Sequence, residues 1–400
     1  MTEGKNIICI SQTTWYGEFT KSTVQLLSLL AAKNNIFFVE YPFTVKDVIM
    51  SILGKQRAQV ARMFGFKKRI QTIKTPFETT INHLVMPPVL PVDFIKNETI
   101  FNFFFGINAF IYKYQLKKII KKYQLNNPII ITAYNPMYGL AMVGKLKEFL
   151  NIYYCYDGMD TQRHKSRIYD IETEFCKKVD GIITTSDYLN SEKLKLNKES
   201  FVVKNGVDFN LFVPHAKKSV SENTLEKKVG YIGTLDFRFD IDIMEFAIKN
   251  LPQVTFEFTG YLLNHQIVER LSTYKNVSFF GSVKAEEVPK LLAKYDAGII
   301  PYKMDEVNKN IYPLKINEYL AVGVPVIMTA FANLTDFENM VSSAKTKEIF
   351  KECIENELTN DSLSQIEKRI SFAKQNSWEG RAVEFENILE YFIKQKNKKA

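Results

Sequence analysis

Runs of apolar residues that end in a polar turn, and are then followed by a helical pattern, recur along this chain of 400 residues. The runs in the first half are Lys5–Ser11, Asn35–Tyr41, Pro128–Tyr134, Ile152–Tyr156, Gly181–Thr185 and Phe201–Val203. Those in the second half are Lys228–Gly233, Val254–Tyr261, Asn276–Val283, Asp296–Tyr302 and Val326–Met328. Strands that are apolar on both faces and alternate with helices are typical of parallel sheets covered on both sides. The pattern predicts an α/β protein built from doubly wound parallel sheets.

The length of the chain and one polar segment divide this pattern into two domains. A single hydrophobic core rarely serves more than about 250–300 residues, and 46% of this chain is hydrophobic. Residues 214–227, PHAKKSVSENTLEK, are polar and interrupt the alternation. We therefore expect one Rossmann-like domain over residues 1–213 and a second over residues 228–375. A long amphipathic helical pattern runs from Ser362 to Lys394.

The stretch Pro301–Thr329 carries the clearest candidate binding site. Pro313 opens a short helix and Gly323 ends it before the next strand. Lys315 and Glu318 are three residues apart and share a face of this helix. Backbone N–H groups and a lysine at a helix start suit the phosphates of a nucleotide, and the carboxylate suits its ribose hydroxyls. A surface helix whose Lys and Glu are solvated fits the local pattern equally well.

Other candidates for nucleotide binding follow the predicted strands of the second domain. They are Gly233 and Thr234, Gly260 and Tyr261, Tyr302, and Arg238. Glycine lets backbone approach phosphate closely, and a guanidinium pairs with phosphate through two hydrogen bonds. A surface arginine is the plain alternative for Arg238. Asp240 and Asp242 form a D-x-D pair, but Asp242 and Glu245 favour a helix capping box, so we expect no metal site.

In the first domain, the candidates lie after the first and fourth apolar runs along the chain. Gly17 follows the opening strand, where a glycine lets the backbone approach a substrate, although Gly17 and Trp15 also suit a turn and its packing. Asp157 stands where a strand ends, which is where open α/β sheets present groups to ligands. Its carboxylate can take a proton from an acceptor hydroxyl, or can simply cap a turn. Asp160, Arg163 and His164 follow as acceptor contacts, and a solvated turn is the alternative. We assign no role to His83, His215 or His265.

The motif P-x-K-x-x-E-Y-L-A-x-G-x-P-V resembles the donor-binding segment of GT-B glycosyltransferases. It consists here of Pro313, Lys315, Glu318, Tyr319, Leu320, Ala321, Gly323, Pro325 and Val326. The family consists of metal-independent enzymes with two Rossmann-like domains that face a central cleft. Bacterial polysaccharide glycosyltransferases of the teichuronic-acid and xanthan glucuronosyltransferase kind are similar to this chain. Many family-four relatives carry a second Glu eight residues before the first, and that position is Asn310 here.

The resemblance implies a role for each candidate. Asp157 is expected to be the general base, Lys315 and Arg238 are expected to stabilise a departing diphosphate, and Glu318 would bind ribose. The donor would be a nucleotide sugar, such as a UDP-sugar, transferred with inversion and without cofactor or metal. Residues 376–400 would form a helix that crosses back to the first domain. The alternatives are a retaining family-four-type enzyme, a nucleotide-sugar epimerase of the same fold, or a non-catalytic membrane-associated scaffold.

The charge distribution favours a membrane surface and a lipid-linked acceptor. The net charge is +9, and residues 1–150 hold 19 Lys/Arg against 8 Asp/Glu. Two segments there combine apolar and basic residues, as interfacial helices do. A helix buried on one face and solvated on the other is the alternative. Residues 45–74 contain Lys55, Arg57, Arg62, Lys67, Lys68 and Arg69, and residues 100–114 contain seven aromatic residues that precede Lys117, Lys118, Lys121 and Lys122.

The remaining features point to a cytoplasmic protein at the inner membrane face. The four cysteines are widely spaced, which favours neither disulfides nor a metal knuckle. We expect neither a signal peptide nor a membrane-spanning helix, because no start of that kind and no uncharged run of sufficient length is visible. No motif for nucleic acid appears, so the expected partners are the nucleotide sugar, the lipid-linked saccharide and the membrane.

Overall fold

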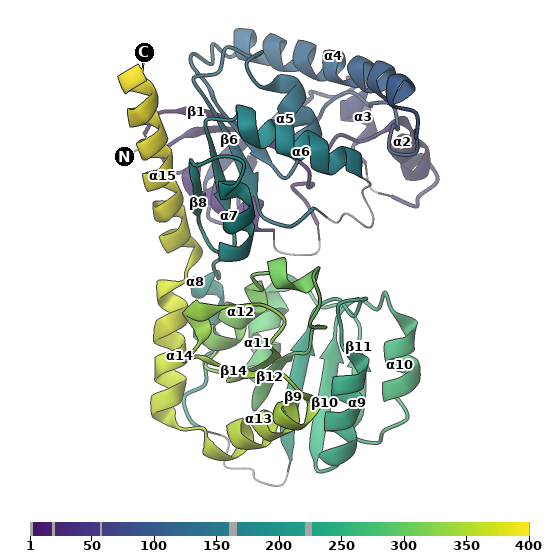
Figure 1. The fold of residues 1–400 in the computed structure, drawn as a ribbon, viewed down its shortest axis with the longest axis vertical. Helices are drawn as coiled ribbons and strands as arrows, with labels where there is room; N and C mark the ends of the chain where they lie inside the picture. Colours follow the sequence, from purple (N-terminus) through teal and green to yellow (C-terminus); the bar gives the residue numbers. More distant parts are fainter. Residues whose placement is uncertain (1–2, 18–20, 57, 160–165, 221–225, 400) are drawn as a thin grey trace. The chain divides into compact units, whose positions relative to one another are not determined.

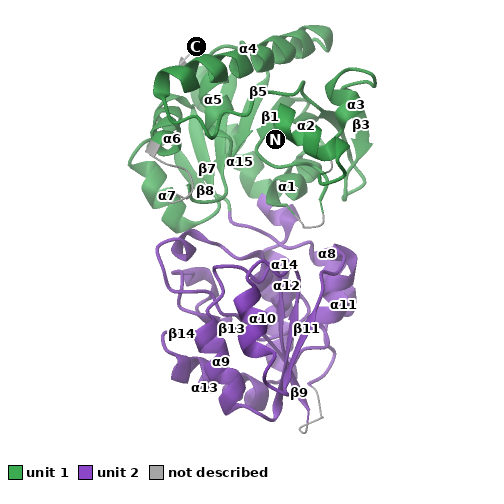
Figure 2. Ribbon diagram, turned by 90° about the vertical axis from the view of Figure 1, so that its right-hand side faces the viewer, with its two compact units in different colours: residues 1–17, 21–203, 382–400 green, residues 18–20, 204–381 purple. Residues whose placement is uncertain are grey.

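The computed structural model describes residues 3–17, 21–56, 58–159, 166–220 and 226–399, and these form two compact units (Figures 1 and 2). The first unit holds the chain up to Val203 and again from Ala382 onward, and the second holds Lys204–Arg381. From the sequence we put the boundary at residue 213. Residues 204–213 pack in the second unit because Val207 and Phe212 are buried in its core.

The described residues of the first unit form a sheet in the order β3-β4-β2-β1-β5-β6-β7-β8. All neighbours are parallel except β3 and β4, which are antiparallel. The strands are β1 (Asn6–Ser11), β2 (Asn35–Val39), β3 (Ile70–Lys74), β4 (Thr80–Leu84), β5 (Ile129–Ala133), β6 (Leu150–Cys155), β7 (Gly181–Thr184) and β8 (Ser200–Val202).

Helices cover both faces of this sheet. They are α1 (Ser22–Leu30), α2 (Val45–Ile52), α3 (Val60–Met63), α4 (Glu98–Lys122), α5 (Pro136–Met142), α6 (Ser166–Lys178), α7 (Asp187–Leu194) and the later part of α15 (Trp378–Lys399). Alternate residues of β1 enter separate cores, because Ile7 and Cys9 pack with residues of α1 and α15 whereas Ile8 and Ile10 pack with residues of α4. Burial on both faces explains why the central strands read as continuous apolar runs, whereas β3 at the edge of the sheet is partly exposed and mixed in sequence.

The second unit has an all-parallel sheet in the order β11-β10-β9-β12-β13-β14. Its strands are β9 (Lys227–Ile232), β10 (Val254–Thr259), β11 (Val277–Phe280), β12 (Ala297–Ile300), β13 (Val326–Thr329) and β14 (Val341–Ala344). Its helices are α8 (Phe209–Phe212), α9 (Ile241–Asn250), α10 (His265–Leu271), α11 (Val288–Leu292), α12 (Leu314–Ala321), α13 (Lys347–Asn360), α14 (Leu363–Gln375) and the start of α15.

The amphipathic pattern from Ser362 to Lys394 forms two helices, because the structure breaks it into α14 and α15 at Asn376 and Ser377. An earlier segment of the chain pairs with the break. The N–H of Val207 donates to the carbonyl of Asn376 at 3.0 Å, and the N–H of Trp378 donates to the carbonyl of Val207 at 2.9 Å. The backbone groups at the break between the two helices therefore bond to a segment about 170 residues earlier in the chain. The periodicity of the sequence cannot predict a contact of this kind.

Helix α15 continues into the first unit and contributes apolar side chains to its core. Phe385 and Leu389 are fully buried there, and Phe392 occupies the place of a side chain that Gly181 of β7 lacks. A Cβ atom at Gly181 would lie 2.0 Å from Cζ of Phe392. The glycine is therefore required by helix packing and not by a turn.

Candidate functional site

Three neighbouring strands of the second sheet end at the same edge, and each is followed by a candidate residue. Strands β10, β9 and β12 are adjacent and parallel. Gly233 follows β9, Gly260 follows β10, and Tyr302 comes two residues after β12. Since the carboxyl ends of parallel strands meet at one edge, the fold brings these three predicted positions together.

Gly233 and Gly260 touch each other through their backbones. Both have positive φ, at +149° and +144°, which side chains rarely tolerate. A Cβ atom at Gly260 would lie 2.0 Å from the carbonyl oxygen of Gly233. Neither position can carry a side chain without moving the edge of the sheet.

Lys315 lies directly against Gly233. A Cβ atom at Gly233 would be 2.3 Å from Cε and 2.7 Å from Nζ of Lys315. Helix α12 begins at Leu314 after Pro313, and no side chain caps its start. The ammonium group therefore lies over the end of β9, close to the first turn of a helix whose dipole is positive at that end.

Tyr302 brings two cations together. Its hydroxyl is 3.2 Å from Nζ of Lys315, and the guanidinium carbon of Arg238 is 5.4 Å from its ring centroid. Burial acts to raise the pKa of Tyr302, but the charges of Lys315 and Arg238, with hydrogen bonds from Tyr231 and Lys315, lower it overall. A buried phenol with a lowered pKa reports a positive local potential.

Arg238 is held by a partner that the sequence analysis did not identify. Its Nε lies 3.0 and 3.1 Å from the two carboxylate oxygens of Asp236, and its Nη2 lies 2.7 Å from Oδ2. Asp236 is buried and also accepts the backbone N–H of Arg238 at 3.0 Å. The carboxylate of Asp236 therefore fixes the orientation of the Arg238 guanidinium and balances part of its positive charge.

Glu318 lies one turn after Lys315 and is partly buried. Burial raises the pKa of its carboxyl group, and the neighbouring Lys315 opposes that rise. On the other side of α12, Tyr319 fixes the helix to the sheet, a role that the sequence did not reveal. Its hydroxyl donates to the carbonyl of Gly230 at 3.0 Å and accepts the N–H of Ile232 at 3.1 Å.

Thr234 and Tyr261 lie in the loops that complete this edge, and both are partly exposed. The carbonyl of Thr234 accepts the hydroxyl of Tyr231 at 2.9 Å, and the carbonyl of Tyr261 accepts the N–H of Leu235 at 2.8 Å. The edge of the second sheet therefore contains all eight predicted donor contacts.

The expected capping box at Asp242 and Glu245 is wrong. The helix cap is Asp240, whose side chain accepts the N–H of Ile243 at 3.1 Å. Asp242 and Glu245 instead form ion pairs with Arg270 of α10, the first of them at 2.8 Å. Within the described ranges, no group of three or more His, Cys, Asp or Glu side chains could hold a metal ion.

In the first unit, Asp157 follows β6 and is exposed at the carboxyl edge of its sheet. Its Oδ1 accepts the N–H of Gly158 at 2.8 Å, and the carbonyl of Gly158 accepts the hydroxyl of Tyr134 at 2.7 Å. Burial is the main reason that the pKa of Tyr134 is raised, and the charge of Asp157 adds to it.

Gly17 lies at the same edge, after β1, and is exposed. A Cβ atom on Gly17 would be 2.9 Å from Nζ of Lys21, which donates to the carbonyl of Tyr16 at 2.8 Å. The other predicted acceptor contacts, Asp160, Arg163 and His164, lie outside the described residues.

Comparison with known proteins finds a matching family model, a relative in sequence and several solved structures. Residues 226–360 match the family model described as glycosyl transferases group 1. The chain is 32% identical over 168 residues to the putative teichuronic acid biosynthesis glycosyltransferase TuaH of Bacillus subtilis (strain 168). That match covers 40% of this chain and 42% of the relative, so it spans less than half the length of either protein.

Solved structures share the fold over nearly the whole chain. Sucrose-phosphate synthase from Thermosynechococcus elongatus has a TM-score of 0.70 at 15% identity and covers 98% of this chain and 100% of its own. HepE of Anabaena, solved in complex with UDP, has a TM-score of 0.63 at 12% identity, with coverage of 96% and 100%. These likenesses confirm the predicted pair of Rossmann-like domains.

Proposed function

We propose that this chain, which has the GT-B fold and carries a glycosyl transferases group 1 domain, is a glycosyltransferase with a nucleotide-sugar donor. The observation that carries the proposal is the position of Lys315 over Gly233, between a helix start and Tyr302. This arrangement provides positive charge and closely approachable backbone at one edge of a parallel sheet. Those are the features that bind a diphosphate.

In this proposal the donor diphosphate lies across Gly233 and contacts Lys315 and Arg238. The two cations stabilise the negative charge that develops on the leaving diphosphate, so the reaction needs no metal ion. Glu318 accepts the ribose hydroxyls. We propose UDP as the nucleotide, supported by the complex of HepE with UDP on the same fold.

We propose Asp157 as the general base, with the acceptor hydroxyl bound near Gly17, Asp160, Arg163 and His164. An exposed carboxylate at the carboxyl edge of the first sheet suits the role because it can reach a bound substrate. The base removes the hydroxyl proton while the oxygen attacks the anomeric carbon, which inverts that carbon. Asn310 stands where many family-four relatives carry Glu, which favours this single displacement.

The acceptor in this proposal is a lipid-linked or growing polysaccharide at the inner face of the membrane. The likeness to a relative named for teichuronic acid biosynthesis supports a polysaccharide. Among the residues that the structure describes, no helix is both long and apolar enough to cross a membrane. Contact with the membrane would therefore be made by a surface.

Helix α4 carries two apolar faces, and only one of them is packed. Phe101, Tyr112 and Leu116 are buried, with Tyr112 and Leu116 in the core of the first unit. The other face is exposed and follows the i, i+3, i+4 spacing of a helix side. Its residues are Ile100, Phe103, Phe104, Ile107, Phe110 and Tyr114.

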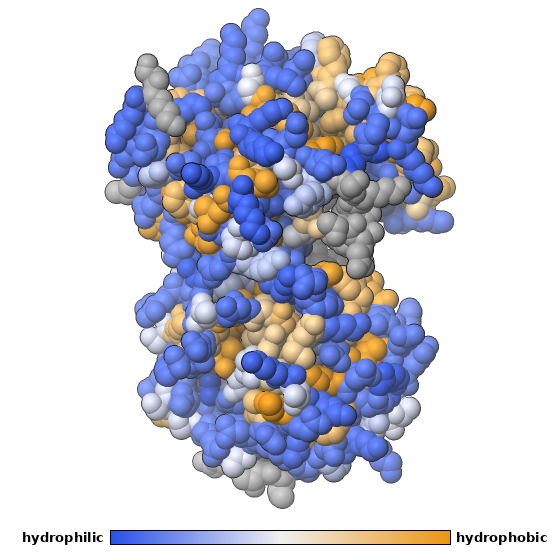
Figure 3. Space-filling view, in the orientation of Figure 1, coloured by the Kyte–Doolittle hydropathy of each residue, from blue (hydrophilic) through white to orange (hydrophobic). Residues whose placement is uncertain are grey.

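More apolar side chains are exposed around α2 and α3, which Figure 1 draws on the same side of the first unit as α4. They are Ile49, Ile52, Leu53, Phe64, Phe66 and Phe94, and Phe66 is 85% exposed. Orange side chains gather over this part of the unit in Figure 3. Exposed Lys55, Lys67 and Lys68 accompany them. Apolar groups beside cations suit an anionic bilayer, in which each cation contributes about 1 kcal/mol. We name these exposed residues, which belong to α2, to α4, to the segments that follow α2 and α3, and to the loop before α4, the apolar-basic surface.

Arg62, which was expected at the membrane, is not part of this surface. The prediction that Arg62 is a surface cation is wrong, because its side chain is 4% exposed and forms hydrogen bonds inside the first unit. Arg57 lies outside the described residues.

The donor site is tested by replacing Lys315 with Met. We expect UDP to raise the melting temperature of the wild-type chain and to bind Lys315→Met at least about tenfold more weakly, since a charge-assisted hydrogen bond contributes roughly 1.5–3 kcal/mol. The control is Lys228→Met, a half-exposed lysine paired with Glu257 at the opposite end of β9. Equal UDP affinity in Lys315→Met and the control would exclude this site.

The general base is tested by Asp157→Asn. We expect transfer from the UDP-sugar to alkyl glycosides, followed by UDP release, to fall at least about 100-fold because general-base catalysis contributes roughly 10²–10⁴-fold. Binding of UDP should not change. Asp170→Asn, an exposed carboxylate on α6, is the control. Transfer at the wild-type rate in Asp157→Asn would mean that another group is the base, or that none is needed.

The membrane surface is tested by sedimentation with phosphatidylglycerol vesicles. Serine at Phe64, Phe66, Phe103 and Phe110 should weaken binding at least about tenfold, because each buried aromatic ring contributes roughly 1.5–3 kcal/mol. Binding should also weaken as salt is raised. The control places serine at Leu263 and Leu363, which are exposed in the second unit. If both variants sediment like the wild-type chain, this surface does not bind membranes.

A further inference from the structure

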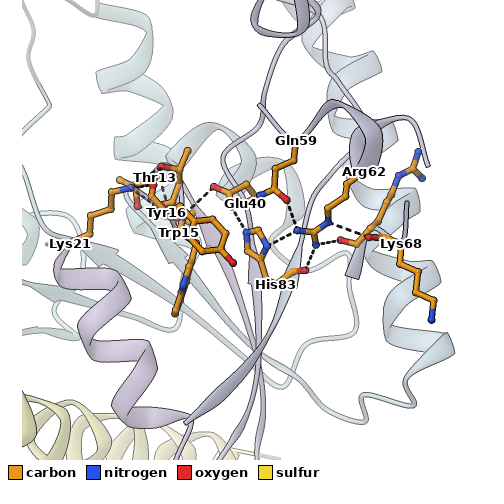
Figure 4. Close-up of polar contacts among 12 residues, drawn as sticks. Thr13, Trp15, Tyr16, Lys21, Glu40, Gln59, Arg62, Lys68 and His83 are labelled. Atoms are coloured by element: carbon orange, nitrogen blue, oxygen red, sulfur yellow. Dashed lines mark hydrogen bonds and ion pairs between the residues drawn. The ribbon is translucent and has the colours of Figure 1, made fainter. Parts of the chain in front are cut away.

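Three ionisable side chains lie in contact inside the first unit, away from the residues assigned above (Figure 4). They are Glu40, His83 and Arg62, which are 1%, 0% and 4% exposed. Glu40 follows β2, His83 lies in β4, and Arg62 lies in α3. A buried ionic group costs stability unless it is fully paired, and an apolar residue of similar size often serves a core better. Their placement therefore needs an explanation beyond packing.

The hydrogen bonds among these three side chains run in one direction, from Arg62 through His83 to Glu40. Nη1 of Arg62 is 2.9 Å from Nδ1 of His83, and because a guanidinium only donates, Nδ1 must be the acceptor. The hydrogen of a neutral imidazole is then on Nε2, which donates to Oε2 of Glu40. The other oxygen, Oε1, accepts the backbone N–H of Trp15 at 3.0 Å. Glu40 therefore accepts from both the histidine and the loop after β1.

Arg62 is anchored by all five of its N–H groups. Besides His83 Nδ1, it donates to Oε1 of Gln59 and to the carbonyls of Lys68, Arg69 and His83, at 2.6–3.1 Å. The guanidinium cannot rotate without breaking several of these bonds. It therefore fixes the ring of His83, and the ring fixes the carboxylate of Glu40.

The loop that Glu40 holds presents an aromatic ring to solvent. The Trp15 ring packs edge-on against Phe38, with the ring centroids 5.0 Å apart. The next residue, Tyr16, is 56% exposed, and its ring lies 5.6 Å from the ring of His83. From the other side, Nζ of Lys21 donates to the carbonyls of Thr14 and Tyr16 at 2.5 and 2.8 Å. The loop is held by a buried anion and a cation.

This loop and Asp157 lie at the same edge of one sheet. Strand β5 separates β1 from β6, and the loop and Asp157 follow those two strands. At a strand spacing of about 4.8 Å, the two strand ends are roughly 10 Å apart. An exposed tyrosine offers an apolar ring face with a polar tip, which suits a sugar ring.

We propose that Glu40, fixed by His83 and Arg62, is a positioning residue that sets the Trp15–Gly17 loop to bind the saccharide acceptor. The inference rests on the proposed glycosyltransferase function and adds a specific acceptor contact, Tyr16. Glu40 acts through Trp15 and does not touch the substrate.

The variant Glu40→Gln tests the positioning with no change in size. The amide has one oxygen, so it can accept from Trp15 or from His83 but not from both, and its NH2 group faces the other donor. In a Trp378→Phe background, Trp15 is the single tryptophan of the chain. We expect Glu40→Gln to shift Trp15 emission to the red and to raise its acrylamide quenching at least about twofold.

The matched control is Glu386→Gln. Glu386 is 7% exposed and pairs at 3.2 Å with Lys33, which precedes β2 whereas Glu40 follows it. The control should leave Trp15 emission unchanged. If both variants, or neither, alter Trp15 emission, Glu40 does not position the loop specifically and the proposal is overturned.

The acceptor role is tested with octyl β-D-glucoside as the acceptor and a UDP-sugar as the donor. We expect Glu40→Gln to raise the KM for the glucoside at least about tenfold while the affinity for UDP stays within twofold. Lys21→Met removes the two hydrogen bonds from Lys21 to the same loop and leaves Glu40, His83 and Arg62 intact. It should raise this KM even if Glu40→Gln does not fold. Unchanged KM in the folded variants overturns the acceptor role. A wild-type chain that neither binds UDP nor transfers sugar contradicts the proposed function instead, and Trp15 emission still decides whether Glu40 positions the loop.

Discussion

The close approach of Lys315 to Gly233 is the constraint on which the carboxyl edge of the second sheet depends. The ammonium group occupies the space that a side chain at position 233 would fill, and Gly260 must also be bare because it touches the carbonyl of Gly233. Tyr319 bonds α12 to both polar groups of β9 that flank Tyr231, so the helix cannot shift along the strand. Gly233, Gly260 and Tyr319 therefore fix the position of the Lys315 ammonium group.

The electrostatics of this edge follow from that geometry. Lys315 and Arg238 lie near one buried phenol, and their charges lower its pKa in spite of burial. Asp236 orients Arg238 and reduces the cost of keeping two cations close together. A site that is already positive before a ligand arrives does not have to reorganise when charge develops on a leaving group.

Local pattern predicted the features that depend on near neighbours. The apolar runs predicted every described strand except β3, β4 and β14, because most strands of the two sheets are buried on both faces. The Pro313 and Gly323 signals bounded α12 to within about one residue. Lys315 and Glu318 could be selected because their spacing puts them on one face of a short helix, and Gly233, Gly260 and Tyr302 because they follow predicted strands. Strand β14 and helix α13 carried weaker signals and were not predicted as elements.

Features that depend on distant partners could not be read from the sequence. Arg62 looked like a surface cation, yet its partner His83 is 21 residues away and Glu40 is 43 residues from His83. The break before α15 is made by Val207, and Asp242 pairs with Arg270 instead of capping its own helix. In each case, a contact that forms only in the folded chain overrides a valid local signal.

The most direct measurement of the central claim is hydrogen–deuterium exchange with and without UDP. If a diphosphate binds between the helix start and the two glycines, amides in residues 231–235, 259–262 and 314–318 should exchange more slowly with UDP present. Peptides from the amino ends of the same strands, at residues 227–229 and 254–256, should not change. Protection confined to other regions, or none at saturating UDP, would contradict the account.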